Sequence, residues 1–153
     1  MNDIDDPTDI SFDSLAIDEN TTGAVGQASS VGGGALKAYT LQAGGGSTHN
    51  SDFAISTSGA LTITVAADYE TRNAYSIRVR VTDMSTSLYY EEVFIVTVND
   101  LPDPNDITFD SLEVNENAAN AAVGSATTLG GNVGDTYTYT LESGTGDTDN
   151  ASF

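Results

Sequence analysis

The sequence predicts an all-β protein: a seven-stranded Greek-key β-sandwich followed by a truncated half repeat. Three observations indicate this fold. Apolar and polar residues alternate along many segments, as they do in half-buried strands. No segment of helical length carries apolar residues at helical spacing. Finally, residues 6–20 return as residues 103–117 with ten of fifteen positions identical, and the distance between the copies has the size of one small domain rather than of a solenoid unit.

The first strand is expected over residues 10–18. Its apolar positions change phase between Phe12 and Leu15, which are three residues apart instead of two. Such a change marks either a bulge or a strand that passes from one sheet to the other. Seven strands in about a hundred residues, with a switch of this kind, are typical of a Greek-key sandwich.

The remaining strands of the first copy are rich in β-branched and aromatic residues and are separated by turn residues. Tyr75, Ile77 and Val79, for example, alternate with polar residues, and Thr57-Ser58-Gly59 predicts a hairpin turn. With the first strand included, the predicted strands are 10–18, 24–30, 37–42, 52–56, 61–65, 75–82 and 91–99.

The second copy supplies only the first three strands, the third of them over Tyr137, Tyr139 and Leu141. We therefore divide the chain into a complete repeat (2–101), an acidic proline-containing linker (102–106) and the N-terminal half of a second repeat (107–153). A three-stranded remnant exposes an apolar face and open edges. We expect it to be disordered or to exchange strands with another molecule; exchange within one chain is not expected, because the linker reaches only about 20 Å.

The composition excludes some partners. Four basic residues face 23 acidic ones, which gives a formal net charge of −19. Nucleic acid and anionic membranes are excluded as ordinary partners, because both need basic residues. The sequence has no cysteine, so disulfides and thiolate metal sites are absent, and it has no apolar run long enough for membrane insertion. The acidic residues are then either a hydrated surface or ligands of divalent cations.

Several acidic residues lie where strands end. Glu19 ends the first strand, Asp68 and Glu70 follow the fifth, and Asp100 and Asp103 follow the seventh. In a seven-stranded sandwich these three places lie at one pole, beside the linker. Five neighbouring carboxylates repel one another unless a cation joins them, and Ca²⁺ accepts six to eight oxygens in irregular geometry. The five residues together predict a calcium site, although a solvated acid is the alternative for each one alone.

These motifs resemble those of tandem cadherin repeats in their bacterial cadherin-like form. The matching residues are Glu19-Asn20, Asp68-Tyr69-Glu70, and the stretch from Val96 to Asp103, in which an alternating strand runs into an acidic linker. The resemblance implies a sandwich whose Ca²⁺ ions sit at the junctions between repeats. It also implies an extracellular or cell-surface adhesion protein whose nearest partners are the neighbouring repeats of its own chain.

The sequence departs from the cadherin pattern at two places. Pro102 and Pro104 stand where the family's linker often has asparagine, and Ser29-Ser30 replaces the Asp-x-Asp pair of animal cadherins. We therefore expect fewer ions at each junction than in animal cadherins. Asn132 and Asp135 are weaker candidates for ligands from the second copy.

Two other functions stay open. A carbohydrate-binding module would use exposed aromatic side chains, for which Tyr89, Tyr90 and Tyr69 are the candidates. Homophilic self-association is the second. An enzyme is not expected, because a catalytic triad needs a histidine held beside its nucleophile by a carboxylate, and the single histidine, His49, lies in a glycine-rich loop.

Overall fold

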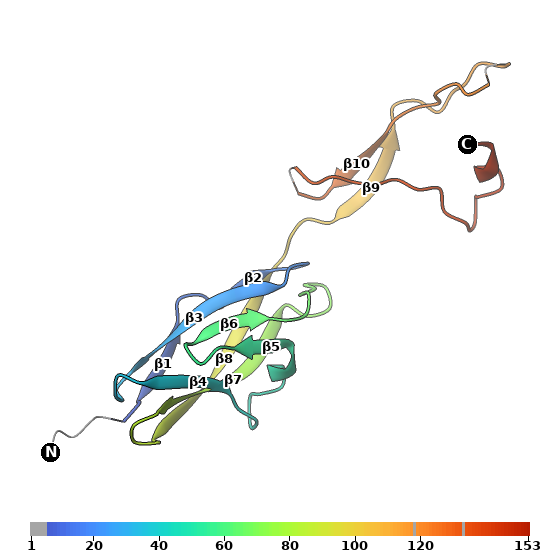
Figure 1. The fold of residues 1–153 in the computed structure, drawn as a ribbon. Coiled ribbons are helices and arrows are strands. Elements are labelled where there is room, and N and C mark those ends of the chain that lie inside the picture. The colour runs from blue at the N-terminus through green and yellow to red at the C-terminus, as the bar shows by residue number, and fades with distance from the viewer. Residues whose placement is uncertain (1–5, 118, 133) are drawn as a thin grey trace. The chain divides into compact units, whose positions relative to one another are not determined.

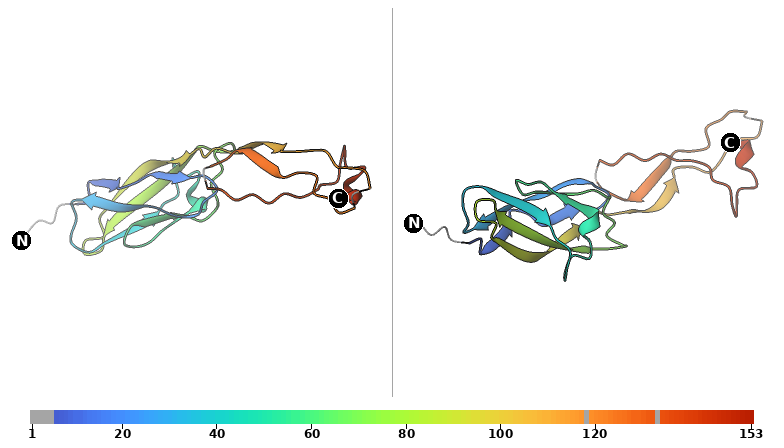
Figure 2. Two further views of the ribbon diagram at one scale, coloured as in Figure 1. Left: turned by 90° about the horizontal axis from the view of Figure 1, so that it is seen from above. Right: turned by 60° about the horizontal axis from the view of Figure 1, so that its bottom comes forward.

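The structure is a computed structural model that describes residues 6–117, 119–132 and 134–153 (Figures 1 and 2). Residues 2–5 of the predicted first repeat lie outside the described residues. The chain forms two compact units, Met1–Asp100 and Leu101–Phe153. In the described part of the chain, no helix has the length and the apolar character needed to cross a membrane.

The first unit is a sandwich of two four-stranded sheets, which confirms the predicted all-β class (Figure 1). One sheet has the order β1-β3-β6-β5 and consists of β1 (Asp9–Phe12), β3 (Gly23–Val31), β6 (Ala60–Ile63) and β5 (Phe53–Ile55). The other has the order β2-β8-β7-β4 and consists of β2 (Ala16–Asp18), β8 (Tyr89–Asn99), β7 (Ala74–Asp83) and β4 (Lys37–Leu41). A single 3-10 turn, η1 (Asn50–Asp52), precedes β5.

The predicted first strand is divided between the sheets. β1 pairs antiparallel with β3, whereas β2 pairs parallel with β8, so the phase change between Phe12 and Leu15 marks a crossing. The described part of the first unit therefore has eight strands where seven were predicted.

A glycine in β3 makes this crossing feasible. A Cβ atom on Gly26 would lie 2.2 Å from the carbonyl oxygen of Ser14, well inside van der Waals contact. The side chain of Asp13 fixes the same point, because its Oδ1 accepts a hydrogen bond from the Gln27 N–H at 2.6 Å. The chain can pass over β3 only where β3 has no side chain.

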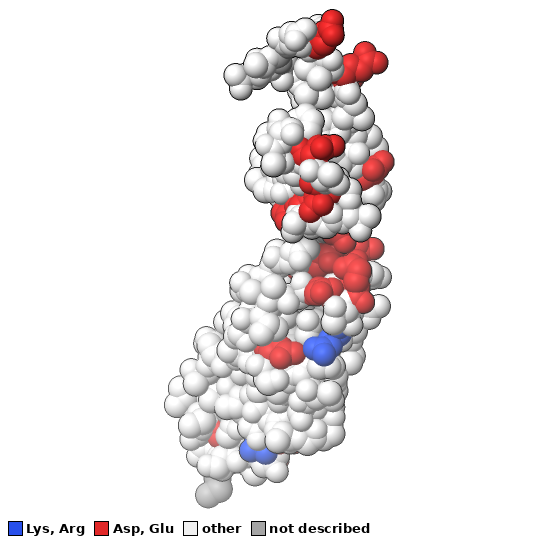
Figure 3. All heavy atoms as spheres, turned by 90° about the vertical axis from the view of Figure 1, so that its right-hand side faces the viewer, with Lys and Arg blue, Asp and Glu red and all other residues white. Residues whose placement is uncertain are grey.

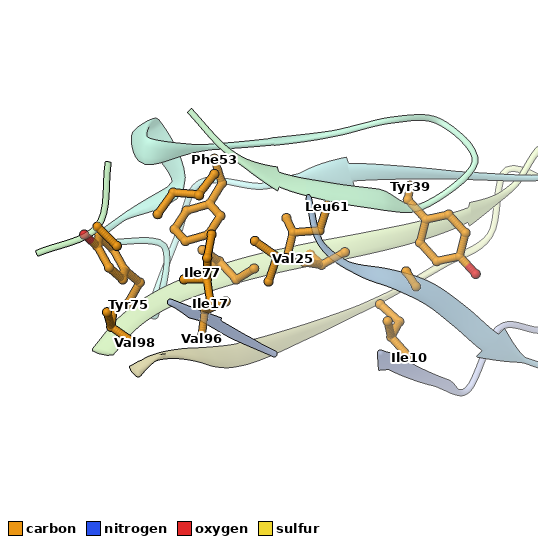
Figure 4. Packing of buried hydrophobic residues seen from close by; sticks show 14 of the residues in the cluster. Ile10, Ile17, Val25, Tyr39, Phe53, Leu61, Tyr75, Ile77, Val96 and Val98 are labelled. Carbon is orange, nitrogen blue, oxygen red and sulfur yellow. The ribbon is translucent and has the colours of Figure 1, made fainter. Parts of the chain in front are cut away.

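The hydrophobic core fills the space between the two sheets (Figure 4). Alternate residues of β7 supply its centre, and Ile77, Val79 and Val81 are fully buried. The rings of Phe53 and Tyr75 meet edge to face, with their centroids 5.4 Å apart. The alternation seen in the sequence therefore separates the core side of β7 from its solvent side.

The second unit contains one two-stranded sheet, in which β9 (Pro104–Phe109) pairs antiparallel with β10 (Ala126–Gly130), and a 3-10 turn, η2 (Asn150–Ser152). The strand predicted over residues 137–141 is not formed, and that prediction was wrong. Its counterpart in the first unit, β4, pairs with β7 alone. The 153-residue sequence holds no second counterpart of β7, so residues 137–141 have no strand to pair with.

Candidate metal centre

Three segments that are distant in sequence come together at one pole of the first unit: the end of β2, the loop after β6 and the end of β8. The N–H of Glu19 donates to the carbonyl of Asn99 at 3.1 Å, which continues the β2–β8 pairing. The N–H of Asn20 donates to the carbonyl of Ala67 at 2.7 Å. Backbone hydrogen bonds thus join all three segments.

Each of these segments contributes one carboxylate to a compact group. Oxygens of Glu19, Glu70 and Asp100 lie within 4.8 Å of one another. Because Ca²⁺ binds oxygens at 2.3–2.6 Å, two oxygens on a common ion are at most about 5 Å apart. The three carboxylates therefore have the donor type and the spacing that one hard divalent cation requires. Figure 3 shows acidic side chains gathered where the first unit ends.

Glu19 is the buried member of the group, at 1% exposure, whereas Glu70 and Asp100 are exposed. Its Oε2 accepts a hydrogen bond from the Tyr69 N–H at 3.3 Å. A carboxylate is seldom buried unless it is paired or coordinates a metal. Burial thus fixes the Glu19 carboxylate beside the exposed carboxylates of Glu70 and Asp100.

Asn20 provides the turn that follows Glu19. It adopts a left-handed backbone conformation with φ of 60°, which asparagine tolerates better than most residues. Asn117, its counterpart in the second copy, has φ of 62°. The repeated Glu-Asn pair therefore combines a candidate ligand with the residue that turns the chain after it. The sequence motif predicts the pair but not this division of roles.

Asp68 lies outside the group of three carboxylates. Its Oδ1 accepts a hydrogen bond from the Thr71 N–H at 2.9 Å, and its Oδ2 accepts one from the Thr71 hydroxyl at 2.8 Å. These bonds lower the pKa of Asp68, and the bond from the Thr71 backbone has the larger effect. The N–H of Arg72 also donates to the Asp68 carbonyl at 2.8 Å, so Asp68 closes the turn that carries Glu70.

Asp103 belongs to the second unit. Of the five predicted ligands, the first unit thus brings together Glu19, Glu70 and Asp100, and the ligand roles of Asp68 and Asp103 stay predictions. Arg72, the basic residue next to the Asp68–Glu70 motif, pairs with Asp52 at 3.2 Å.

Asp83 is the last residue of β7, at the end of the strand opposite Ala74. It is 1% exposed, and its carboxylate accepts hydrogen bonds from the Ser85 hydroxyl, the Gly34 N–H and the Ser85 N–H. These bonds, that of the Ser85 hydroxyl foremost, lower the pKa of Asp83 to about 2. Asp83 therefore holds the turn after β7 and the loop before β4.

The residues behind the alternative functions have structural roles. The Nδ1 of His49 accepts a hydrogen bond from the Ser76 N–H at 2.8 Å. His49 thus gives a partner to a backbone group of β7 that lies beyond the end of β4. Tyr69 and Tyr90 pack against the core, and the exposed ring of Tyr89 lies 4.1 Å from the guanidinium carbon of Arg80. Of the three tyrosines, Tyr89 is thus the exposed one, and Tyr69 and Tyr90 are partly buried.

No protein-family model and no curated protein matches the sequence. Among solved structures, the chain is similar to extracellular cadherin domains 3–6 of protocadherin gamma B2, with 20% identity and a TM-score of 0.50, over 71% of this chain and 28% of that one. It is also similar to the third cadherin domain of human protocadherin 7, with 14% identity and a TM-score of 0.45, over 65% of this chain and 91% of that one.

The likeness to the protocadherin gamma B2 domains shows the fold. The chain has the cadherin-like β-sandwich that its sequence motifs resemble. It spans less than a third of the protocadherin gamma B2 chain, which carries several such domains.

Proposed function

We propose that this chain is a non-enzymatic, calcium-stiffened repeat module of a larger extracellular adhesion protein of the bacterial cadherin-like kind. The observation that carries the proposal is the convergence of Glu19, Glu70 and Asp100 from three separate segments of a cadherin-like sandwich. A module of this kind acts as a spacer, whose neighbours are further repeats of the same chain.

The proposed calcium ion is held by the carboxylates of Glu19, Glu70 and Asp100, with Asp68 and Asp103 as further ligands. Its positive charge offsets the repulsion among these groups. Glu19 is held by the end of β2 and by the Tyr69 N–H, so a bound ion ties the loop after β6 and the end of β8 to β2.

Thermal unfolding with calcium and with a chelator tests this proposal. An ion that binds only the folded state at a hundredfold excess over its Kd stabilises it by about 2.7 kcal/mol. For a domain of this size we expect calcium to raise the Tm by about 10 to 20 °C. Glu70→Gln should abolish the rise.

The matched control is Glu113→Gln, which removes one exposed acidic charge from the second unit. It should leave the calcium-dependent rise in Tm unchanged, and calorimetry should show calcium binding to this variant but not to Glu70→Gln. Equal Tm values for the unsubstituted chain with millimolar calcium and with chelator would overturn the proposal.

A further inference from the structure

β8 has one open edge. The strand runs for 11 residues, but β2 pairs only with its last three, Thr97 to Asn99. The N–H of Thr97 donates to Leu15 on the β2 side, whereas the N–H of Val98 donates to Asn73 on the β7 side. Because this direction alternates along a strand, the backbone groups of Tyr89, Glu91, Val93 and Ile95 face away from β7. Within the described residues, no strand pairs with them.

This open edge has a composition that favours pairing with another strand. The segment from Val93 to Val98 consists of apolar residues and one threonine. The side chains of Val93 and Ile95 are 42% and 52% exposed. Exposed edges rich in β-branched and aromatic residues are the usual sites of strand addition between molecules.

Glu92 places a carboxylate on the core-facing side of this edge strand. It lies opposite Val79, which is fully buried, and cross-strand neighbours point to the same face, so the Glu92 side chain points between the sheets. Its Oε2 is buried and has no hydrogen-bond partner among the described residues. A buried oxygen without a partner destabilises a fold.

The neighbouring Glu91 differs from Glu92 in the direction of its side chain and in its hydrogen bonds. It points to the outer face, where it accepts hydrogen bonds from Arg78 and Arg80. These contacts, with that of Arg78 foremost, lower the pKa of Glu91. The chain thus satisfies Glu91 within the fold but leaves the Glu92 carboxylate with an unpaired oxygen.

We propose that Glu92 protects the open edge of β8 from pairing with the same edge of a second copy of this chain. Two identical edges match when they run antiparallel about a two-fold axis. A strand added to the open edge of β8 would cover the Glu92 carboxylate and remove its remaining contact with water. Removing water from a charge that has no partner costs free energy. Pairing centred on this residue would also bring two like charges together.

The test is sedimentation velocity over a range of protein concentrations. Glu92→Val and Glu92→Thr should form a concentration-dependent dimer, whereas Glu92→Lys, which keeps an inward-pointing charge, should sediment like the unsubstituted chain. Using the unsubstituted chain as the baseline removes any association that the second unit contributes. Circular dichroism and Tm values establish that each variant is folded.

A second substitution locates the contact. The N–H of Val93 faces the open side, so Val93→Pro removes a donor from the edge but no hydrogen bond to β7. The double variant Glu92→Val, Val93→Pro should therefore sediment like the unsubstituted chain. If the uncharged Glu92 variants do not dimerise, or if the double variant dimerises as strongly as Glu92→Val, the proposal is wrong.

Discussion

Two segments of this chain, residues 6–53 and 103–153, are related copies, yet their side chains end in different environments. Ile10 is 3% exposed, and its counterpart Ile107 is 56% exposed. Phe53 is 6% exposed, and its counterpart Phe153 is 76% exposed. The first copy is followed by β6, β7 and β8, which complete its sandwich, and the second copy has no such strands within the 153 residues.

Short-range contacts are nevertheless the same in both copies. A Cβ atom on Gly124 would lie 2.1 Å from the carbonyl oxygen of Ser111, as one on Gly26 would from Ser14. Asp110 accepts a hydrogen bond from the Ser125 N–H at 2.7 Å, just as Asp13 does from Gln27. The crossing point of the first strand is therefore encoded locally and forms without a completed sandwich.

Strand formation, unlike these short-range contacts, differs between the two copies. β1 and β3 pair with each other, and their counterparts β9 and β10 do so in the second unit. β2 and β4 pair only with β8 and β7, and the counterparts of β2 and β4 are not strands in the second unit. A strand forms in the second copy only where its partner lies within the same half.

The comparison also bears on the predicted exchange of strands between molecules. Each 153-residue chain has two N-terminal halves but only one C-terminal half. Moving that half to a second molecule covers one apolar face and uncovers another. Exchange between copies of this chain therefore gains no net burial of apolar surface.

The largest difference between the copies should appear when the same phenylalanine is removed from each. Phe53→Ala leaves a cavity in the core and should lower the free energy of unfolding by about 3 to 5 kcal/mol. Phe153→Ala removes an exposed ring and should change it by less than about 0.5 kcal/mol. Urea denaturation measures both. A similar loss in the two variants would mean that the second copy also has a packed core.

Replacing the crossing glycines should have a somewhat smaller effect. Gly26→Ala forces a Cβ atom against the Ser14 carbonyl and should destabilise the first unit by about 3 kcal/mol. Gly124→Ala produces the same clash in the second copy and should disturb only the amide NMR signals of β9 and β10. Unfolding of the first unit unchanged by Gly26→Ala would show that the crossing adapts without strain.

The calcium response should distinguish the two Glu-Asn pairs. Glu19→Gln should remove the calcium-dependent stabilisation, about 2.7 kcal/mol at a hundredfold excess over Kd. Glu116→Gln should retain it, because the second copy has no counterparts of Glu70 and Asp100 within this sequence. The measurement is the Tm of each variant with and without calcium. Loss of the response in both variants would contradict a site formed by the first copy.

The smallest effect is expected from Asp83, which lies in the half that only the first copy has. Its pKa is lowered to about 2 from an ordinary value of 3.8. Its contribution to stability is therefore complete above about pH 5 and declines as the pH falls through 4 towards 2. Between pH 5 and 2.5, the free energy of unfolding of Asp83→Asn should fall by less than that of the unsubstituted chain. Urea denaturation at each pH measures both. Asp135→Asn is the control and should follow the unsubstituted chain.

Much of the fold follows from local patterns. The alternation of apolar and polar residues located every strand of the first unit to within a few residues. It does so because successive side chains of a strand point to opposite faces of the sheet. The motifs at strand ends predicted the convergence of Glu19, Glu70 and Asp100. The interaction of Asp68 with Thr71 was not predicted, because many exposed hydroxyls and amides can bind a carboxylate and a sequence pattern does not rank them.

By itself, the sequence therefore determined the all-β class, the repeat, the strand positions of the first unit and the pole at which Glu19, Glu70 and Asp100 lie. Tertiary structure alone decided between a bulge and a crossing in the first strand, the absence of a strand over residues 137–141 and the unpaired oxygen of Glu92. The physical reason is the range of the interactions. Alternation is a property of adjacent residues, whereas pairing and burial depend on partner strands that lie tens of residues away.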